Sequence, residues 1–185
     1  MLFLAAAALG LALGLVTGGS LRHLETVKLR WPLVVVAALL IKEAGVVSTF
    51  ASSPAVPYLY SAALLILVAW TLGHRRALPG LELVALGMAM NLLVVLANGG
   101  HMPVAPALAT GGPPQLHELG TWGQYALAGP GTRLNWLADT IQLPGPLGAI
   151  FPGAYSPGDL VAIVGIAVAC FLVPKGRRQK AVAPP

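Results

Sequence analysis

Two charged side chains, Lys42 and Glu43, stand in an otherwise apolar run from Pro32 to Phe50. A charge near the centre of a bilayer costs on the order of 3 kcal/mol, so each of them needs a partner, water or a change of protonation. Asn91 lies about ten residues into another apolar run, at a similar expected depth. Adjacent residues on a helix point about 100° apart, so we expect one of the two charges to contact Asn91 rather than its own neighbour.

These three residues allow two interpretations. In the first, Lys42, Glu43 and Asn91 form a polar site that binds the head group of a ligand, an ion or a proton. In the second, they are a structural clamp between helices, or the Lys42 ammonium extends to the membrane surface along its aliphatic stem. The sequence leaves both interpretations open.

Two aspartates in the second half of the chain, Asp139 and Asp159, would form an acid/base couple acting on a lipid or a peptide if the fold brings them together. Asp159 also has a structural explanation, because Ser156 precedes it by three residues at the start of an apolar run, as in a helix capping box. Asn98 and His101 flank a Gly-Gly pair that is typical of a helix end. Both are further candidates for contact with a ligand.

Motifs for the common catalytic reactions are absent from the sequence. It contains no phosphate-binding glycine loop followed by lysine, no His-Glu-x-x-His and no Gly-x-Ser-x-Gly. None of the four histidines falls within an apolar run, and no Cys/His cluster has the spacing of metal ligands. We therefore predict no metal and no cofactor, and a non-catalytic protein is favoured over an enzyme.

The composition indicates a membrane protein. Of 185 residues, 57% are apolar and 9% are charged, whereas about 25% of the residues in a soluble domain are charged. The net charge of +5 is compatible with nucleic-acid binding, but the 11 Lys and Arg residues are spread thinly between apolar runs instead of forming one basic face. We expect membrane lipids as partners and no nucleic acid.

Five apolar segments predict an all-α integral membrane protein, a five-helix transmembrane bundle in one domain over residues 1–185. Pro57 and Pro157 suit the first turns of the helices that they begin. Residues 1–19 also resemble the apolar core of a signal peptide, but they lack its basic leading region, so we expect them to be retained. The predicted spans cover residues 2–18, 32–50, 57–72, 81–97 and 157–173.

The cations predict the orientation of this bundle. Nine of the 11 follow the first, third or fifth segment, and loops rich in Lys and Arg stay in the cytoplasm. The N-terminus is therefore predicted outside and the C-terminus inside. The nine cations are Arg22, Lys28, Arg30, Arg75, Arg76, Lys175, Arg177, Arg178 and Lys180.

Small residues recur at every fourth position of the first segment, at Ala6, Gly10, Gly14 and Gly18. On a helix they line one groove, which another backbone can approach closely. We expect this groove to pack within the bundle. The alternative is a contact with a partner membrane subunit through Gly10, Gly14 and Gly18.

Residues 98–157 are rich in proline and glycine and would lie outside the membrane. A structureless loop of this length is uncommon unless it is functional. Apolar residues recur at helical spacing over 115–127 and over 133–143, which predicts two short interfacial helices. We therefore expect an amphipathic outer lid over the bundle.

Short motifs in the second half carry a family resemblance. The run Asn98–Val104 reads Asn-Gly-Gly-His-Met-Pro-Val, Asp139 is followed by Leu143-Pro144, and Ser-Pro-Gly-Asp at 156–159 opens the last segment. With these motifs the chain resembles a family of small bacterial integral membrane proteins known as a domain of unknown function. The resemblance covers most of the chain. It implies a bacterial source and the cytoplasmic membrane, and it implies no activity.

Three functions follow as hypotheses. The first is a non-catalytic accessory subunit or scaffold of a membrane complex, which requires no polar cavity. The second is a protein that binds or transports a small molecule or lipid, with a cavity that reaches Lys42, Glu43 and Asn91. The third is an enzyme that processes lipids or peptides and brings Asp139 and Asp159 together at an opening accessible to lipid.

Overall fold

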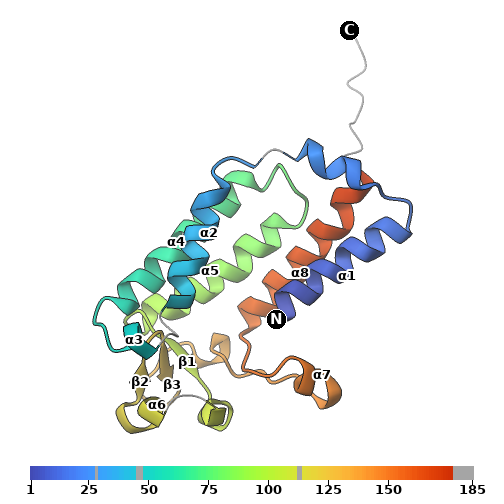
Figure 1. Cartoon of the computed structure of the whole chain (residues 1–185). Coiled ribbons are helices and arrows are strands. Elements are labelled where there is room, and N and C mark those ends of the chain that lie inside the picture. Colours follow the sequence, from blue (N-terminus) through green and yellow to red (C-terminus); the bar gives the residue numbers. More distant parts are fainter. Residues whose placement is uncertain (28, 45–47, 112–113, 177–185) are drawn as a thin grey trace.

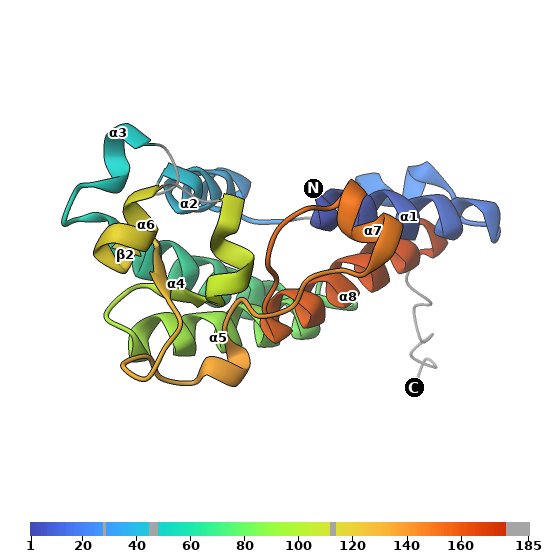
Figure 2. The same ribbon diagram turned by 90° about the horizontal axis from the view of Figure 1, so that it is seen from below.

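The computed structural model describes residues 1–27, 29–44, 48–111 and 114–176 of the chain. Its longest helices lie side by side in the order α2, α4, α5, α8, α1 (Figure 1). Seen from below, α4, α5 and α8 form a layer, and α2 and α1 lie on the same face of that layer (Figure 2). The bounds of these helices are α1 (Leu2–Val16), α2 (Pro32–Ala44), α4 (Val56–His74), α5 (Leu81–Ala97) and α8 (Pro157–Leu172).

Shorter elements connect the long helices. A six-residue 3-10 helix, η1 (Leu21–Thr26), follows α1, and a three-residue one, η4 (Val173–Lys175), extends α8. The remaining short helices are α3 (Ser48–Ala51), η2 (Pro106–Gly111), α6 (Pro114–Leu119), η3 (Asn135–Leu137) and α7 (Gly145–Ile150).

Small residues let neighbouring helices approach closely. Gly10 and Gly14 of α1 are buried against α8, where an added Cβ would meet the carbonyl oxygens of Ala167 and Phe171. A Cβ on Gly165 of α8 would come within 2.7 Å of the carbonyl oxygen of Gly80. The groove of α1 therefore packs within the chain, whereas Gly18 is exposed and faces open space.

The predicted five-span bundle is wrong. Among the described residues, two helical stretches of 19 residues each are long and apolar enough to cross a membrane, Val56–His74 and Pro157–Lys175. The helices α1, α2 and α5 have 15, 13 and 17 residues. At 1.5 Å per residue these span about 20–25 Å, less than the bilayer core of about 30 Å. The two long stretches indicate a membrane association.

The prediction of an all-α fold is also wrong, because residues 98–157 contain a three-stranded sheet at one end of the helices (Figure 1). Strand β3 (Tyr125–Leu127) lies in its centre, parallel to β1 (Met102–Val104) and antiparallel to β2 (Thr121–Trp122). The helix expected over 115–127 ends at Leu119, since Gly120 takes a φ of +74° that turns the chain into β2. Over 133–143 the chain forms the single turn η3 instead of a helix.

Five of the seven described Lys and Arg residues lie in segments at the end of the helices opposite to the sheet, and the other two are Lys42 and Arg133. Arg22 and Arg30 lie between α1 and α2, Arg75 and Arg76 follow α4, and Lys175 follows α8 (Figure 1). Four further cations of the orientation argument, Lys28, Arg177, Arg178 and Lys180, lie outside the described residues.

Candidate ligand-binding cavity

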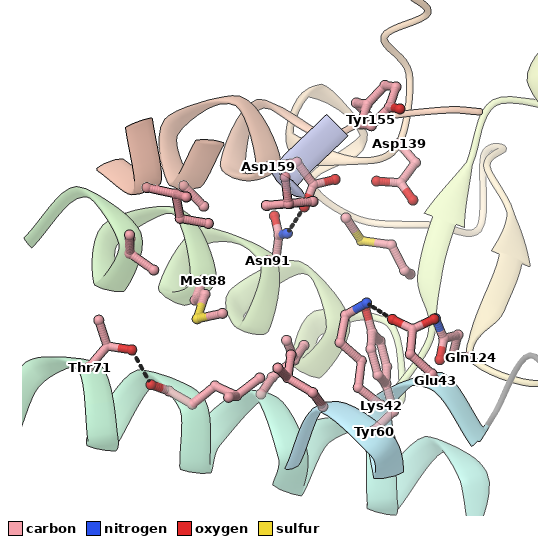
Figure 3. A pocket seen from close by; sticks show the side chains of 18 of the residues that line it. Lys42, Glu43, Tyr60, Thr71, Met88, Asn91, Gln124, Asp139, Tyr155 and Asp159 are labelled. Atoms are coloured by element: carbon pink, nitrogen blue, oxygen red, sulfur yellow. Dashed lines mark hydrogen bonds and ion pairs between the residues drawn. The ribbon is translucent and has the colours of Figure 1, made fainter. Parts of the chain in front are cut away.

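A cavity of about 550 Å³ lies between α2 and α1, over the layer of α4, α5 and α8. We call seven of its apolar side chains the apolar wall, namely Val35, Leu39, Leu64, Leu67, Val84, Met88 and Ile166. Toward the sheet the lining becomes polar (Figure 3). We call this part the polar end; its residues are Lys42, Glu43, Asn91, Gln124, Asp139 and Asp159.

Lys42 and Glu43 form an ion pair at the last turn of α2. The distance between Lys42 Nζ and Glu43 Oε1 is 2.9 Å, and the side chains are 30% and 65% exposed. The expectation that these neighbours do not contact each other is therefore wrong, because both side chains are long enough to bridge the angle between them. We expected Lys42 or Glu43 to contact Asn91. Asn91 instead forms hydrogen bonds with Ser156 and Asp159 at the start of α8.

A closed network of hydrogen bonds joins α5 to the start of α8. Asn91 donates from Nδ2 to Asp159 Oδ1 at 2.8 Å, and the Ser156 hydroxyl donates to Asn91 Oδ1 at 2.8 Å. The backbone amide of Asp159 donates to Ser156 Oγ at 2.9 Å, and the amide of Ser156 donates to Asp159 Oδ2 at 3.1 Å. This is the capping box that the spacing of Ser156 and Asp159 suggests. Both carboxylate oxygens of Asp159 thus accept a hydrogen bond.

Asp139 reaches the cavity from the loop beside β1. Its backbone amide donates to the carbonyl of Pro103 at 2.9 Å, and its carbonyl accepts from the amide of Ala105 at 3.1 Å. These bonds extend the ladder of β1 by one bridge and fix the position of the residue. Asp139 as a whole is 8% exposed, and its side chain faces the same space as Asp159 (Figure 3).

Two buried side-chain oxygens in the part of the chain that the structure describes have no hydrogen-bond partner: Asp139 Oδ1 and Gln124 Oε1. Gln124 is 2% exposed, and its backbone carbonyl accepts from the amide of Met102 at 2.7 Å. Both residues line the cavity. A buried polar atom without a partner costs about 1–3 kcal/mol, and such atoms are rare in native proteins.

Burial raises the pKa of Asp139 well above its ordinary value of 3.8. The negative charge of Asp159 raises it further, and the Lys42 ammonium opposes the shift in part. Burial also raises the pKa of Tyr125, which borders the same space. Burial and the charge of Asp159 therefore both favour the protonated form of Asp139, relative to an aspartate in water.

A profile described as a Family of unknown function (DUF5317) matches residues 26–171. The chain belongs to this family. The resemblance inferred from the motifs of the second half is therefore confirmed, and every residue of the polar end lies in the matched part of this DUF5317 chain. The curated proteins and the solved structures contain no match to it.

The other predicted site residues of this family member lie away from the cavity. Asn98 holds the loop at Arg133, since its Nδ2 donates to the Arg133 carbonyl at 2.9 Å and its Oδ1 accepts from the Arg133 amide at 2.7 Å. His101 is half-buried and does not line the cavity. Among the described residues, no three His, Cys, Asp or Glu side chains are grouped so that they could hold a metal ion.

The sequence analysis missed several residues that complete the site. Tyr125 begins β3, and Gln124 lies in the turn between β2 and β3. Strands of two or three residues are too short to produce a period-two pattern. Tyr60 and Tyr155 were not connected with the cavity, although Tyr155 directly precedes Ser156. In the sequence, the motif 98–104 came nearest to indicating Gln124 and Tyr125, because it contains Met102, which lines the same cavity.

Proposed function

We propose that this member of the family binds a small amphiphilic molecule in the cavity. One observation carries the proposal: a cavity of about 550 Å³ with an apolar wall and, at its polar end, two buried oxygens without partners. Pockets for drug-sized ligands measure about 300–1,000 Å³ and combine a mainly apolar lining with a few polar groups that orient the ligand. The apolar wall would hold the chain of the ligand, and the polar end would hold its head group.

The position of the cavity favours a ligand that comes from the membrane. The helices on either side of it pack on different partners, α2 on α4 and α1 on α8. The outer faces of these two helices expose large apolar residues, namely Leu33, Val36 and Leu40 on α2 and Leu4, Leu9 and Leu13 on α1. Such faces suit contact with lipid chains, where an amphiphile would be dissolved.

We further propose that the protein is a multi-pass protein of the bacterial cytoplasmic membrane, with the sheet and the N-terminus outside and the C-terminus inside. The helices α4 and α8 run in the same direction, and α5 runs back between them (Figure 1). The 17 residues of α5 are at the lower limit for a membrane span, so this return would also need the residues that flank the helix. The segments with Arg22, Arg30, Arg75, Arg76 and Lys175 share one end of the molecule, which supports a cytoplasmic position for that end.

Two other hypotheses receive less support. A scaffold for partner subunits has no need of a polar cavity, and the small-residue groove of α1 is already occupied by α8. An acid/base enzyme needs two carboxyl groups that are free to act on a substrate. Asp159 does not meet this condition, because both its oxygens accept hydrogen bonds within the protein.

A photolabelling experiment on the full chain in lipid nanodiscs tests the proposal. The probe is a ten-carbon alcohol with a diazirine in its chain, and mass spectrometry of the digested protein identifies the labelled residues. The Leu39→Trp variant fills the apolar wall, while Leu40→Trp adds the same bulk to the neighbouring, 68% exposed position outside the cavity.

We expect labelling of the cavity residues in the wild type and in Leu40→Trp, and at least a five-fold reduction in Leu39→Trp. Labelling confined to the outer faces of α1 and α2, or equal labelling of the cavity in both variants, would overturn the proposed function.

A further inference from the structure

The hydrogen-bonding groups at the polar end are unequally satisfied. Its two unpartnered atoms, Asp139 Oδ1 and Gln124 Oε1, are both acceptors. A ligand that satisfies them must present N–H or O–H donors. A head group made of acceptors alone, such as a carboxylate, would bring further lone pairs against them.

Two donor side chains of the polar end, Asn91 and Lys42, already have an acceptor within the protein. The Asn91 amide donates to Asp159, and the Ser156 hydroxyl donates to Asn91. The Lys42 ammonium donates to Glu43, whose charge balances its own. The buried atoms without a partner that the polar end offers to a ligand are therefore the two acceptors, Asp139 Oδ1 and Gln124 Oε1.

The charges favour a positive head group. The opposite charges of Lys42 and Glu43 cancel, and the carboxyl groups of Asp139 and Asp159 remain. Three tyrosine rings, those of Tyr60, Tyr125 and Tyr155, also line the cavity. The faces of aromatic rings carry partial negative charge and attract cations.

We propose that the polar end binds a protonated primary or secondary amine, whose N–H groups donate to Asp139 and Gln124 while its apolar chain lies along the apolar wall. This inference rests on the proposed function, and it specifies the class of ligand. A quaternary ammonium carries the same charge but has no N–H group, so it leaves both oxygens without partners.

Binding of an amine is coupled to the ionisation of Asp139. Burial and the charge of Asp159 raise the pKa of Asp139, whereas a cation beside the carboxyl group favours its ionised form. The affinity for the amine therefore rises with pH through the pKa of Asp139, as long as the amine stays protonated. The groups that face Asp139 are Lys42 and Glu43 on α2, Tyr60 on α4, Tyr125 on β3, and Tyr155 and Asp159 at the start of α8.

A series of head groups on one chain tests the inference. Diazirine probes with the same ten-carbon chain and a primary amine, a trimethylammonium, an alcohol or a carboxylate are titrated against the full chain in phosphatidylcholine nanodiscs. We expect half-maximal labelling of the cavity by the amine at a concentration at least ten-fold below that of each of the other three probes. The quaternary probe controls for charge, because it partitions into the membrane as a cation too.

Two variants assign the effect to Asp139. We expect Asp139→Asn to weaken labelling by the amine at least ten-fold, to abolish its pH dependence and to leave labelling by the alcohol unchanged. Glu118→Gln removes one negative charge from the same outer segment at an exposed position outside the cavity, and its labelling should match that of the wild type.

Equal labelling by the amine and the alcohol, with both reduced by Leu39→Trp, would overturn the amine inference and leave the proposed function standing. Labelling by all four probes that Leu39→Trp does not reduce would overturn both.

The natural amine would come from a lipid head group or from a free molecule, and replacing phosphatidylcholine by phosphatidylethanolamine separates these sources. A reduction of amine labelling by phosphatidylethanolamine, which carries a primary amine, supports the inference with a lipid as the source. Undiminished labelling together with the preference for the amine supports it with a free amphiphile as the source.

Discussion

Asn91 in the middle of α5 contacts both ends of the capping box of α8: it donates to Asp159 Oδ1 at 2.8 Å and accepts from the hydroxyl of Ser156 at 2.8 Å. Ser156 and Asp159 in turn bond to each other's backbone amides. The side chains that cap α8 are therefore the same ones that join it to α5. Stability and the shape of the cavity are coupled at this point.

The Asn91→Ala variant should lose this coupling. It removes one donor to Asp159 and the acceptor for Ser156, whose side chain is completely buried. Leaving such groups without partners costs about 1–3 kcal/mol, so we expect the free energy of unfolding in detergent to fall by about that amount. Gln142→Ala removes an exposed amide and serves as the control. An Asn91→Ala protein as stable as Gln142→Ala would show that the network does not stabilise the fold.

The close contact of α5 with α8 should be sensitive to one methyl group. In Gly165→Ala the new Cβ would come within 2.7 Å of the carbonyl oxygen of Gly80 and the amide nitrogen of Val84. Backbone atoms cannot yield as a flexible side chain does, so we expect a loss of about 1–3 kcal/mol in unfolding free energy. Gly73→Ala makes the same change within α4, where a Cβ meets nothing within 4 Å, and it should be neutral or stabilise by about 0.5–1 kcal/mol. Equal unfolding midpoints for the two variants would contradict this packing.

The positions of the long helices could be predicted from the sequence, but not their relation to the bilayer. The helix α5 covers the predicted residues 81–97, and α4 begins one residue before Pro57. An apolar run, however, includes residues that flank a helix. The first run extends to Gly18, whereas α1 ends at Val16, where the Thr17 hydroxyl bonds back to the carbonyl of Leu13 at 2.6 Å. Counting apolar residues therefore overestimated the length of α1.

The polar end was only partly predictable, because its residues come from local and non-local contacts. Lys42, Glu43 and Asn91 stand out as polar residues in apolar runs, and a local spacing indicates the capping role of Asp159. The position of Asp139 depends on its bridge to Val104, 35 residues earlier in the chain. Gln124 depends likewise on the pairing of β1 with β3. Strands this short carry no pattern that specifies their partners, so these contacts appear only in the folded chain.

Asp139 should make the empty protein less stable as the pH rises. Because its pKa is higher in the folded chain than its ordinary value of 3.8, the folded state keeps a proton that the unfolded state has released. Stability therefore falls from pH 3.8 up to the pKa of the folded state, by about 1.4 kcal/mol for each unit between them, and then levels off. Asp139→Asn should remove this slope, while Glu118→Gln should retain it, as measured by unfolding midpoints over that range. A slope shared by all three proteins would assign it to other groups.

The two charges of the ion pair, Lys42 and Glu43, should change the affinity of the polar end for an amine in opposite directions. Lys42→Met removes a positive charge beside the proposed head group, so labelling by the amine probe should strengthen, and Glu43→Gln removes a negative charge, so it should weaken. Both side chains are partly exposed and screened by solvent, and we expect changes of about two- to five-fold each. The double variant, which combines Lys42→Met with Glu43→Gln, should return close to the wild type, because the two charges cancel. If both single variants instead weakened labelling by the amine and by the alcohol alike, the pair would serve to shape the cavity, and the electrostatic argument for a cationic head group would lose this support.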